Sequence, residues 1–286
     1  MVIQEIFYGN TELNKKDSLT TPEIASLTVK VCQIAQNAGD KILEIYNSDF
    51  SVNYKDDRSP LTAADMASHE TISTRLRELT PEIPVLSEES ANVPFEERKQ
   101  WQTYWLIDPL DGTREFVKKN GEFTVNIALI YEHKPVSGII YIPVSGILYF
   151  ASRDNGAFKK YPDKSPEKIK TRKTDPDNLA VAGSRSHGSE KQFRFIRGLG
   201  NIEVIAIGSA LKFCLVAEGK VDIYPRFGPT SEWDTAAAQC IVEEAGGTVT
   251  DLAFIPLTYN TKPSLINPDF LVIADPEYNW SENLPE

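Results

Sequence analysis

The chain has 286 residues, of which 41% are hydrophobic and 25% are charged, and its formal net charge is −11 at pH 7. Such a chain can bury a substantial core in one large domain or two closely packed ones, which excludes an intrinsically disordered protein. The negative charge also excludes a general nucleic-acid binder, because that class of protein needs a basic surface.

The N-terminal part of the chain predicts a tail and a long helix. Residues 1–20 are polar, and we expect them to form a loose tail. Thr21-Pro22 is typical of a helix start, with proline at the first helical position. Apolar residues then recur at spacings of three and four, so an amphipathic helix is predicted to reach about Asn47.

A loop, a second helix and two short apolar segments follow. Asp56–Pro60 predicts the loop, and Thr62 predicts the cap of the helix, with Asp65 three residues later in a variant of the capping box. Pro84–Leu86 and Trp105–Ile107 are short apolar segments that each stop at acidic residues. We expect these acidic residues to lie at strand ends.

The middle of the chain predicts an antiparallel meander. Strands are expected at Phe123–Tyr131, Val136–Tyr141 and Ile147–Ala151, because short polar or Pro/Gly connections separate these apolar segments. Lys159–Asp177 is charged and contains prolines, so it is the predicted boundary between two halves of the protein.

Strands and helices alternate beyond that boundary. The predicted elements are a strand at Ile202–Ile207, a helix at Ser209–Glu218, a strand at Val221–Tyr224 and a helix at Trp233–Ala245, the last closed by Gly246-Gly247. The fold class is therefore predicted as α/β, with an α+β half over residues 21–158 and an α/β half over residues 159–286.

The cysteines and the hydropathy indicate a cytoplasmic protein. Cys32, Cys214 and Cys240 are odd in number and far apart, and each lies in an apolar stretch. We therefore expect buried free thiols in a reducing compartment. The N-terminal segment lacks a long apolar run, and no apolar run in the sequence reaches the length needed to cross a bilayer.

Asp108 and Asp111 form the strongest local signal. They lie three residues apart at the end of the apolar segment Trp105–Ile107, and Asp-Pro and Asp-Gly both favour turns. Both carboxylates could then face one point with the Leu110 carbonyl between them, and Mg²⁺ prefers such oxygen ligands. An ordinary surface turn is the alternative. Metal cations would also let an acidic protein bind an anionic substrate.

Three other acidic positions are ambiguous when each is considered alone. Glu88, in Ser87-Glu88-Glu89, could be a solvated loop residue, and Asp234 could be a routine helix cap that the helix dipole stabilises. Asp57 lies in a segment that could be a simple loop before a helix.

Taken together and in order, these motifs resemble the inositol monophosphatase superfamily of magnesium-dependent, lithium-sensitive phosphatases. The resemblance covers roughly residues 22–275 and rests on the glutamate pair, the Asp108–Thr113 segment, and Trp233-Asp234 ahead of Gly246-Gly247. It implies a layered α-β-α-β-α sandwich of the sugar-phosphatase kind. Two or three Mg²⁺ ions would bind at the junction of its two halves.

Further segments resemble one branch of that superfamily, the bacterial 3'(2'),5'-bisphosphate nucleotidases. They are Asp57–Asp65, Asp111–Phe116, Asn120–Asn126, Ser184–His187, Gly208–Phe213 and Tyr224–Thr230. Arg114 replaces the lysine usual in that branch, which keeps the charge but changes its geometry. The implied reaction is hydrolysis of adenosine 3',5'-bisphosphate to AMP and phosphate, with the sulfated nucleotide as another candidate substrate and a place in sulfate assimilation.

The resemblance also implies roles for individual residues. Glu88, Asp108, the Leu110 carbonyl, Asp111 and Asp234 would hold the metals, and Asp57 and Thr113 would orient and deprotonate the attacking water, with Glu88 sharing that task. The implied substrate contacts are Glu88, Leu110, Asp111, Gly112, Thr113, Ser186, His187, Gly208, Ser209, Arg226 and Asp234. His187 could equally be a surface histidine. We expect Lys212 to be solvated, and Phe123 and Tyr131 to belong to the sheet core.

Two rival functions remain open at this point. An inositol or sugar monophosphatase is one, although the Ser59-Pro60 pair and Arg114-Glu115 disfavour it. A catalytically inactive nucleotide-binding regulator on the same fold is the other, and the intact set of acidic residues speaks against it. The resemblance also implies peripheral association with the inner membrane. The sequence itself leaves the oligomeric state open.

Overall fold

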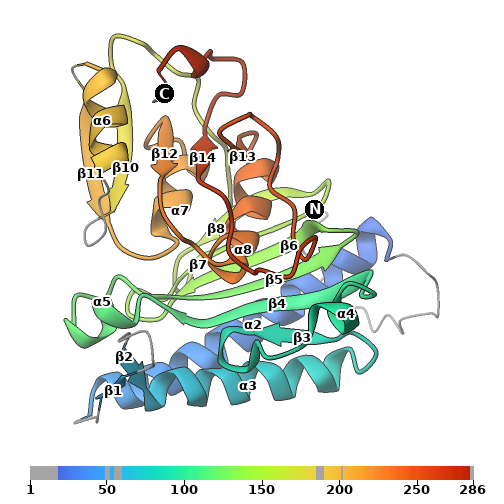
Figure 1. Ribbon diagram of the computed structural model, residues 1–286. Coiled ribbons are helices and arrows are strands. Elements are labelled where there is room, and N and C mark those ends of the chain that lie inside the picture. Colours follow the sequence, from blue (N-terminus) through green and yellow to red (C-terminus); the bar gives the residue numbers. More distant parts are fainter. Residues whose placement is uncertain (1–18, 49–51, 55–59, 185–189, 201, 284–286) are drawn as a thin grey trace.

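The computed structural model describes residues 19–48, 52–54, 60–184, 190–200 and 202–283. Its elements form five layers, in which helices alternate with two β-sheets (Figure 1). The predicted α-β-α-β-α architecture is confirmed. Asp57, Ser186 and His187, which the sequence assigns to the site, lie outside the described residues, as does nearly all of the predicted tail.

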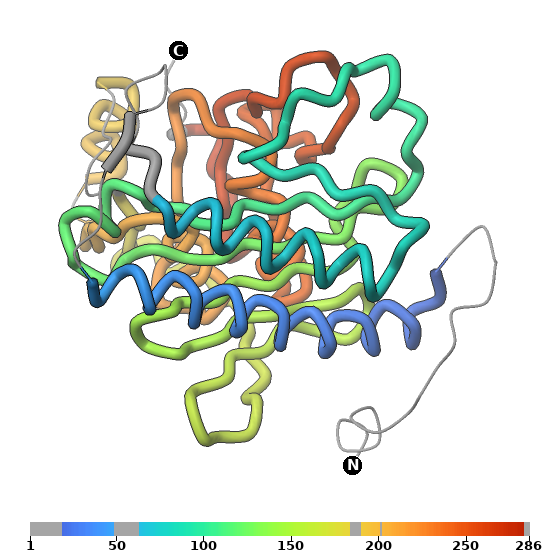
Figure 2. The backbone as a smooth tube through the Cα atoms, turned by 90° about the horizontal axis from the view of Figure 1, so that it is seen from below, coloured from blue at the N-terminus to red at the C-terminus, as the bar shows by residue number. Residues whose placement is uncertain are grey.

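Two antiparallel helices form the first layer. Helix α2 spans Thr21–Tyr46 and helix α3 spans Ala63–Leu79, and they run side by side across one face of the larger sheet (Figure 2). Helix α2 begins one residue earlier than predicted, because Thr20 is the N-cap and forms a capping box with Glu23. Between the two helices, β1 (Val52–Tyr54) pairs with β2 (Pro60–Thr62).

The second layer is a seven-stranded sheet in the order β3-β4-β5-β6-β7-β8-β9. The strands are Val85–Ser87, Thr103–Asp111, Thr124–Tyr131, Lys134–Ile142, Ile147–Ser152, Gly156–Lys160 and Glu167–Ile169. Only the β3–β4 pair is parallel, so the predicted meander is confirmed and continues through two strands that the sequence did not predict. Short helices η1 (Glu88–Ser90), α4 (Phe95–Arg98) and α5 (Thr113–Val117) flank this sheet.

Both faces of this sheet are buried, and side chains alternate between them along each strand. On β5, Val125, Ile127 and Leu129 pack toward α2 and α3, whereas Ala128 and Ile130 pack toward the third layer. The third layer is made of α7 (Leu211–Ala217) and α8 (Glu232–Glu244).

A glycine lets α8 approach the sheet closely. A Cβ atom at Gly138, on β6, would lie 2.1 Å from the Ala237 carbonyl oxygen of α8. The contact therefore requires glycine on the strand, because the nearest atoms that it meets belong to the helix backbone. It fixes the height of α8 above the sheet, and α8 carries one of the predicted metal ligands.

The fourth layer is a five-stranded sheet in the order β11-β10-β12-β14-β13. Its strands are β10 (Ala180–Ser184), β11 (Glu203–Ile207), β12 (Ile223–Arg226), β13 (Thr248–Asp251) and β14 (Phe270–Ile273), and β10 pairs in parallel with β11 and β12. Helix α6 (Glu190–Gly198) forms the fifth layer, where Phe195 packs with Val181, Ile223 and Leu271. The change of sheet falls between Ile169 and Ala180; the predicted division at residue 158/159 stays a prediction.

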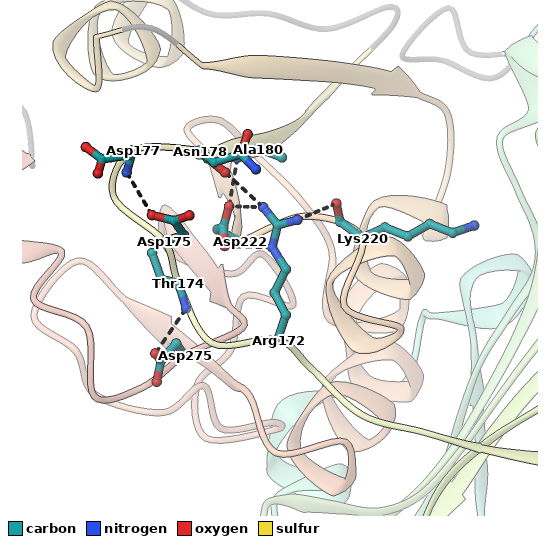
Figure 3. A network of polar contacts seen from close by, with 9 residues as sticks. All are labelled: Arg172, Thr174, Asp175, Asp177, Asn178, Ala180, Lys220, Asp222 and Asp275. Atoms are coloured by element: carbon teal, nitrogen blue, oxygen red, sulfur yellow. Dashed lines mark hydrogen bonds and ion pairs between the residues drawn. The ribbon is translucent and has the colours of Figure 1, made fainter.

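A buried polar network anchors the segment between the sheets (Figure 3). Asp222 is fully buried and accepts hydrogen bonds from Arg172 Nε at 2.8 Å and from the Ala180 amide at 2.7 Å. Arg172 also donates to the Lys220 and Asn178 carbonyls. A buried carboxylate is tolerated here because donors surround it.

The cysteines and the helices bear on two expectations from the sequence. Cys32, Cys214 and Cys240 are buried free thiols, as predicted. No helix within the described ranges combines the length and the apolar character that crossing a membrane requires.

Candidate active site

Strand β4 carries Asp108 and Asp111 through a β-bulge. Asp108 pairs with Asn126 and Asp111 with Thr124, so three steps along β4 match two steps along β5. Regular alternation would place these two aspartates on opposite faces, and the extra residue restores them to one face. Leu110 accordingly packs on the α2–α3 side of the sheet. The structure therefore has a bulge within the strand where a turn was expected. As expected, the two carboxylates face the same side.

Asp234 meets the two aspartates from α8. Ligand oxygens of Asp108, Asp111 and Asp234 all lie within 4.8 Å of one another. The Asp234 carboxylate also accepts a hydrogen bond of 2.9 Å from the Ser231 amide, as the third residue of a capping box. Asp234 is therefore both a helix cap and a member of the acidic cluster.

Glu88 lies near this cluster, at the end of the neighbouring strand, and its charge acts on Asp108 and Asp234. Strands β3 and β4 are parallel, with Ser87 beside Ile107, so Glu88 and Asp108 leave adjacent strand ends. The Ser87 hydroxyl lies 2.8 Å from His69 Nδ1 of α3, which fixes the residue before Glu88.

Burial and a concentration of negative charge raise the pKa values of Asp108 and Asp234 in this cluster. Burial raises the pKa of Asp108 well above its usual value, and the charges of Glu88, Asp111, Asp234 and Asp65 raise it further. Burial, then Asp111 and Glu88, raises the pKa of Asp234 to about 8. Neutralisation by cations would relieve this repulsion. The all-oxygen donor set fits a hard divalent metal.

Asp65 is a further acidic residue at this cluster, and the sequence analysis gave it only a capping role. It lies in the first turn of α3, is 2% exposed, and contributes to the raised pKa of Asp108. The Ser68 hydroxyl, one turn along, donates to the Pro109 carbonyl at 2.7 Å and ties α3 to the bulge. The role proposed for Asp57 stays a prediction, because Asp57 lies outside the described residues.

Gly112 connects the bulge to helix α5. Its φ of 95° lies in the left-handed region, and α5 begins at Thr113 directly after it. A Cβ atom at this position would sit 3.1 Å from the Glu122 carbonyl oxygen. Glycine is required by both the conformation and the space. The helical start that the family resemblance implied at Gly112-Thr113 is confirmed.

The loop at residues 208–210 holds Asp111 from the second half of the chain. Asp111 Oδ2 accepts hydrogen bonds from the Ser209 hydroxyl at 2.5 Å and from the Ala210 amide at 2.7 Å. Ser209 adopts a left-handed φ of 54°, and the Gly208 amide donates to Glu122 Oε2 at 2.9 Å. Of the two predicted loop residues, Ser209 therefore contacts the acidic cluster, and Gly208 precedes it and donates a hydrogen bond to Glu122.

Lys212 is buried, so the expectation of a solvated lysine is wrong. Its ammonium group donates to the Ser209 carbonyl at 2.5 Å, and burial lowers its pKa to about 8. The charge of Asp111 raises the pKa of Lys212, and the charge of Arg226 lowers it. The Arg226 guanidinium donates to Thr230 Oγ1 and to the Pro229 carbonyl.

Phe123 is fully buried in the sheet core, as expected, and Tyr131 packs against that core.

Comparison with known proteins agrees with this arrangement. The family model described as "Inositol monophosphatase family" matches residues 23–280. The chain belongs to this family. It is 48% identical to "3'(2'),5'-bisphosphate nucleotidase CysQ" of Salmonella typhimurium over 245 residues, covering 85% of this chain and 98% of the relative. The protein of the same name from Escherichia coli K12 is 47% identical over the same shares.

A solved structure agrees as well. CysQ from Bacteroides thetaiotaomicron, described as a bacterial member of the inositol monophosphatase family, matches with a TM-score of 0.78 and 43% identity. The match covers 87% of this chain and 97% of that one. An inositol monophosphatase from Thermotoga maritima matches with a TM-score of 0.72 at 21% identity, which shows the shared fold alone.

Proposed function

We propose that this member of the family is a magnesium-dependent 3'(2'),5'-bisphosphate nucleotidase that converts adenosine 3',5'-bisphosphate to AMP and phosphate. The acidic cluster of Asp108, Asp111 and Asp234 carries the proposal. The names of the relatives that cover most of this chain support the nucleotide as substrate.

The metal ligands would come from three elements that the fold brings together. Glu88 after β3, Asp108, Asp111 and the Leu110 carbonyl on β4, and Asp234 on α8 would hold two or three Mg²⁺ ions. Bound metals would make water acidic enough to attack phosphorus and would stabilise the departing sugar oxygen. The raised pKa values of Asp108 and Asp234 support this, because they mark charge that a cation would neutralise.

The attacking water would be oriented by residues of this chain. Asp57 and Thr113 are the pair that the family resemblance implies, with Glu88 sharing the task. Asp65 is a second candidate partner for Thr113, because it is buried at the start of α3 and its charge raises the pKa of Asp108. A substitution of Asp57 and one of Asp65 would separate these two assignments.

The substrate phosphates would meet the surrounding donors. The amides of Gly112 and Thr113 precede the first turn of α5 and would bind one phosphate. Gly208 and Ser209 would lie near the ribose or base, and Arg226 would bind the second phosphate with its guanidinium fork. Ser186 and His187 are the remaining proposed substrate contacts.

Phosphate release from a panel of small phosphorylated metabolites, with and without Mg²⁺, tests the proposal. We expect the bisphosphate nucleotide to be the best substrate, with activity that EDTA abolishes and lithium inhibits. Replacing Asp111 by Asn should abolish turnover. Preference for inositol phosphate would point to the inositol monophosphatase alternative, and nucleotide binding without turnover would point to a regulator.

A further inference from the structure

A buried polar cluster lies behind the metal-site end of α8. Glu232, the first residue of α8, is fully buried, and its Oε2 accepts a hydrogen bond of 2.8 Å from the Asn260 amide. Asn260 adopts a left-handed φ of 57° although it is not glycine. Its side chain accepts a hydrogen bond from the Arg98 guanidinium and donates one to the Arg98 carbonyl. Three residues far apart in the sequence are thus joined in one chain of contacts.

Arg98 commits its guanidinium to the same segment. It is 2% exposed and also donates to the Lys262 carbonyl at 3.2 Å and to the Pro263 carbonyl. In the described part of the chain, Arg98 Nε and Glu232 Oε1 are buried atoms without a hydrogen-bond partner. Buried charges are costly, and here hydrogen bonds from Arg98 to the segment 260–263 offset that cost.

Backbone contacts also hold the start of α8, and together with the Arg98–Asn260–Glu232 contacts they form what we call the clamp. The Glu232 amide donates to the Leu265 carbonyl and the Asn267 amide to the Thr230 carbonyl, both at 2.8 Å. The Asn267 side chain also donates to the Ser231 carbonyl at 3.1 Å. Residues 230–232 are therefore held by the segment 260–267 through both backbone and side chains.

The clamp reaches the acidic cluster through Ser231. The Ser231 amide donates to the Asp234 carboxylate, so the position of Ser231 sets the orientation of that carboxylate. Asp234 lies within 4.8 Å of Asp108 and Asp111. A shift of the first turn of α8 would displace one of the proposed ligands relative to the two on β4.

We propose that Glu232 is a positioning residue for metal binding, and that the Arg98–Asn260–Glu232 cluster fixes the first turn of α8 so that Asp234 faces the aspartates of β4. The inference rests on the proposed metal site. Glu232 itself is fully buried and is not one of the carboxylates of the acidic cluster, so it would act on the metals only through Asp234. Its effect is transmitted through the capped turn, as partners behind metal ligands commonly do.

Binding of Mn²⁺, followed by the electron paramagnetic resonance signal of the free ion, tests this without relying on turnover. We expect Glu232→Ala to weaken Mn²⁺ binding by about tenfold or more. Glu232→Gln keeps a side-chain oxygen that can accept from the Asn260 amide, so its affinity should stay within about threefold of wild type. Asn260→Gly suits the left-handed backbone but removes both contacts to Arg98, and it should weaken binding as well.

Glu218→Ala is the matched control, because the Glu218 side chain is only 9% exposed and accepts a hydrogen bond from Lys159 at 2.6 Å outside the acidic cluster. It should lose stability and keep its Mn²⁺ affinity. Wild-type affinity in folded Glu232→Ala and Asn260→Gly proteins would overturn the inference. If Glu232→Ala does not fold, the Mn²⁺ affinities of Glu232→Gln and Asn260→Gly are compared instead. Equal affinities in these two variants would overturn the inference. Tight Mn²⁺ binding by a wild-type protein that does not hydrolyse the nucleotide would contradict the proposed function alone.

Discussion

Replacing Asp234 by Asn should stabilise the metal-free protein while removing its response to metal. In the folded protein the Asp234 carboxylate lies within 4.8 Å of Asp108 and Asp111. At an effective dielectric constant of about 20, two charges at that distance repel by about 3 kcal/mol. Asparagine removes the charge and keeps an oxygen that can accept from the Ser231 amide. The cap is therefore preserved while the repulsion is relieved.

The size of the effect depends on pH in a defined direction. Asp234 has a pKa of about 8 in the folded, metal-free protein, against a usual value of 3.8. Because the folded state then holds a proton that the unfolded state has lost, stability falls as pH rises from about 4 to about 8. Asp234→Asn should not show this loss. Between pH 5.5 and pH 8 the wild-type protein should lose about 3 kcal/mol that Asp234→Asn keeps, or roughly 8 °C in melting temperature.

Thermal unfolding in EDTA and in Mg²⁺, at pH 5.5 and at pH 8, measures both effects. A ligand at about 100 times its dissociation constant should add about 2.7 kcal/mol to the wild-type protein and almost nothing to Asp234→Asn. Asp275→Asn is the control. Burial alone would raise the pKa of Asp275, but hydrogen bonds from Lys173, Thr174 and Glu277 lower it, so its neutralisation should destabilise the protein with or without metal. A variant at Asp234 that is less stable than wild type in EDTA at pH 8 would refute the reasoning.

Three further substitutions test the surroundings of the site. Asp222→Ala should cost about 3 kcal/mol in urea unfolding, because it leaves Arg172 without its buried partner, whereas nucleotide hydrolysis by the folded fraction should not change. Lys212→Met should cost about 1–3 kcal/mol and lower kcat, because it leaves the Ser209 carbonyl without its donor; an unchanged kcat would separate Lys212 from the site. Gly208→Ala should cost about 1–3 kcal/mol and weaken Mg²⁺ activation, because its Cβ would lie 2.9 Å from Glu115 Cγ. Normal activation would show that the loop can shift freely.

Local pattern was enough to predict the elements that carry the proposed metal ligands. Apolar periodicity predicted α2, the meander and α8, and acidic residues after apolar segments predicted strand ends at Glu88 and Asp108. The convergence of these two residues with Asp234 was implied by the family resemblance. The five-layer architecture came from the family resemblance. Neither source distinguished a bulge from a turn at Asp108–Asp111, because that depends on the register with Asn126 and Thr124 on β5.

Tertiary burial explains what the sequence did not predict. Lys212 looks like an exposed lysine on a short helix, and only the packing of α7 against the second sheet shows that its ammonium group is buried. Asp65 reads as a helix cap because capping is a local role, whereas its proximity to Asp108 depends on how α3 crosses β4. Strands β8 and β9 were not predicted because their order depends on pairing, of β8 with β7 and of β9 with β8.

The carboxylates of the acidic cluster repel one another, and packing elsewhere in the fold holds them together. Asp108 and Asp111 belong to a strand buried on both faces, and Asp234 belongs to a helix that packs closely over Gly138. The repulsion among the carboxylates cannot separate these elements, since each is held by apolar packing and by donors such as the Ala210 amide. Charge relief must therefore come from protons or from cations. A metal-free protein that takes up protons on folding, and releases them on binding Mg²⁺, is the expected consequence.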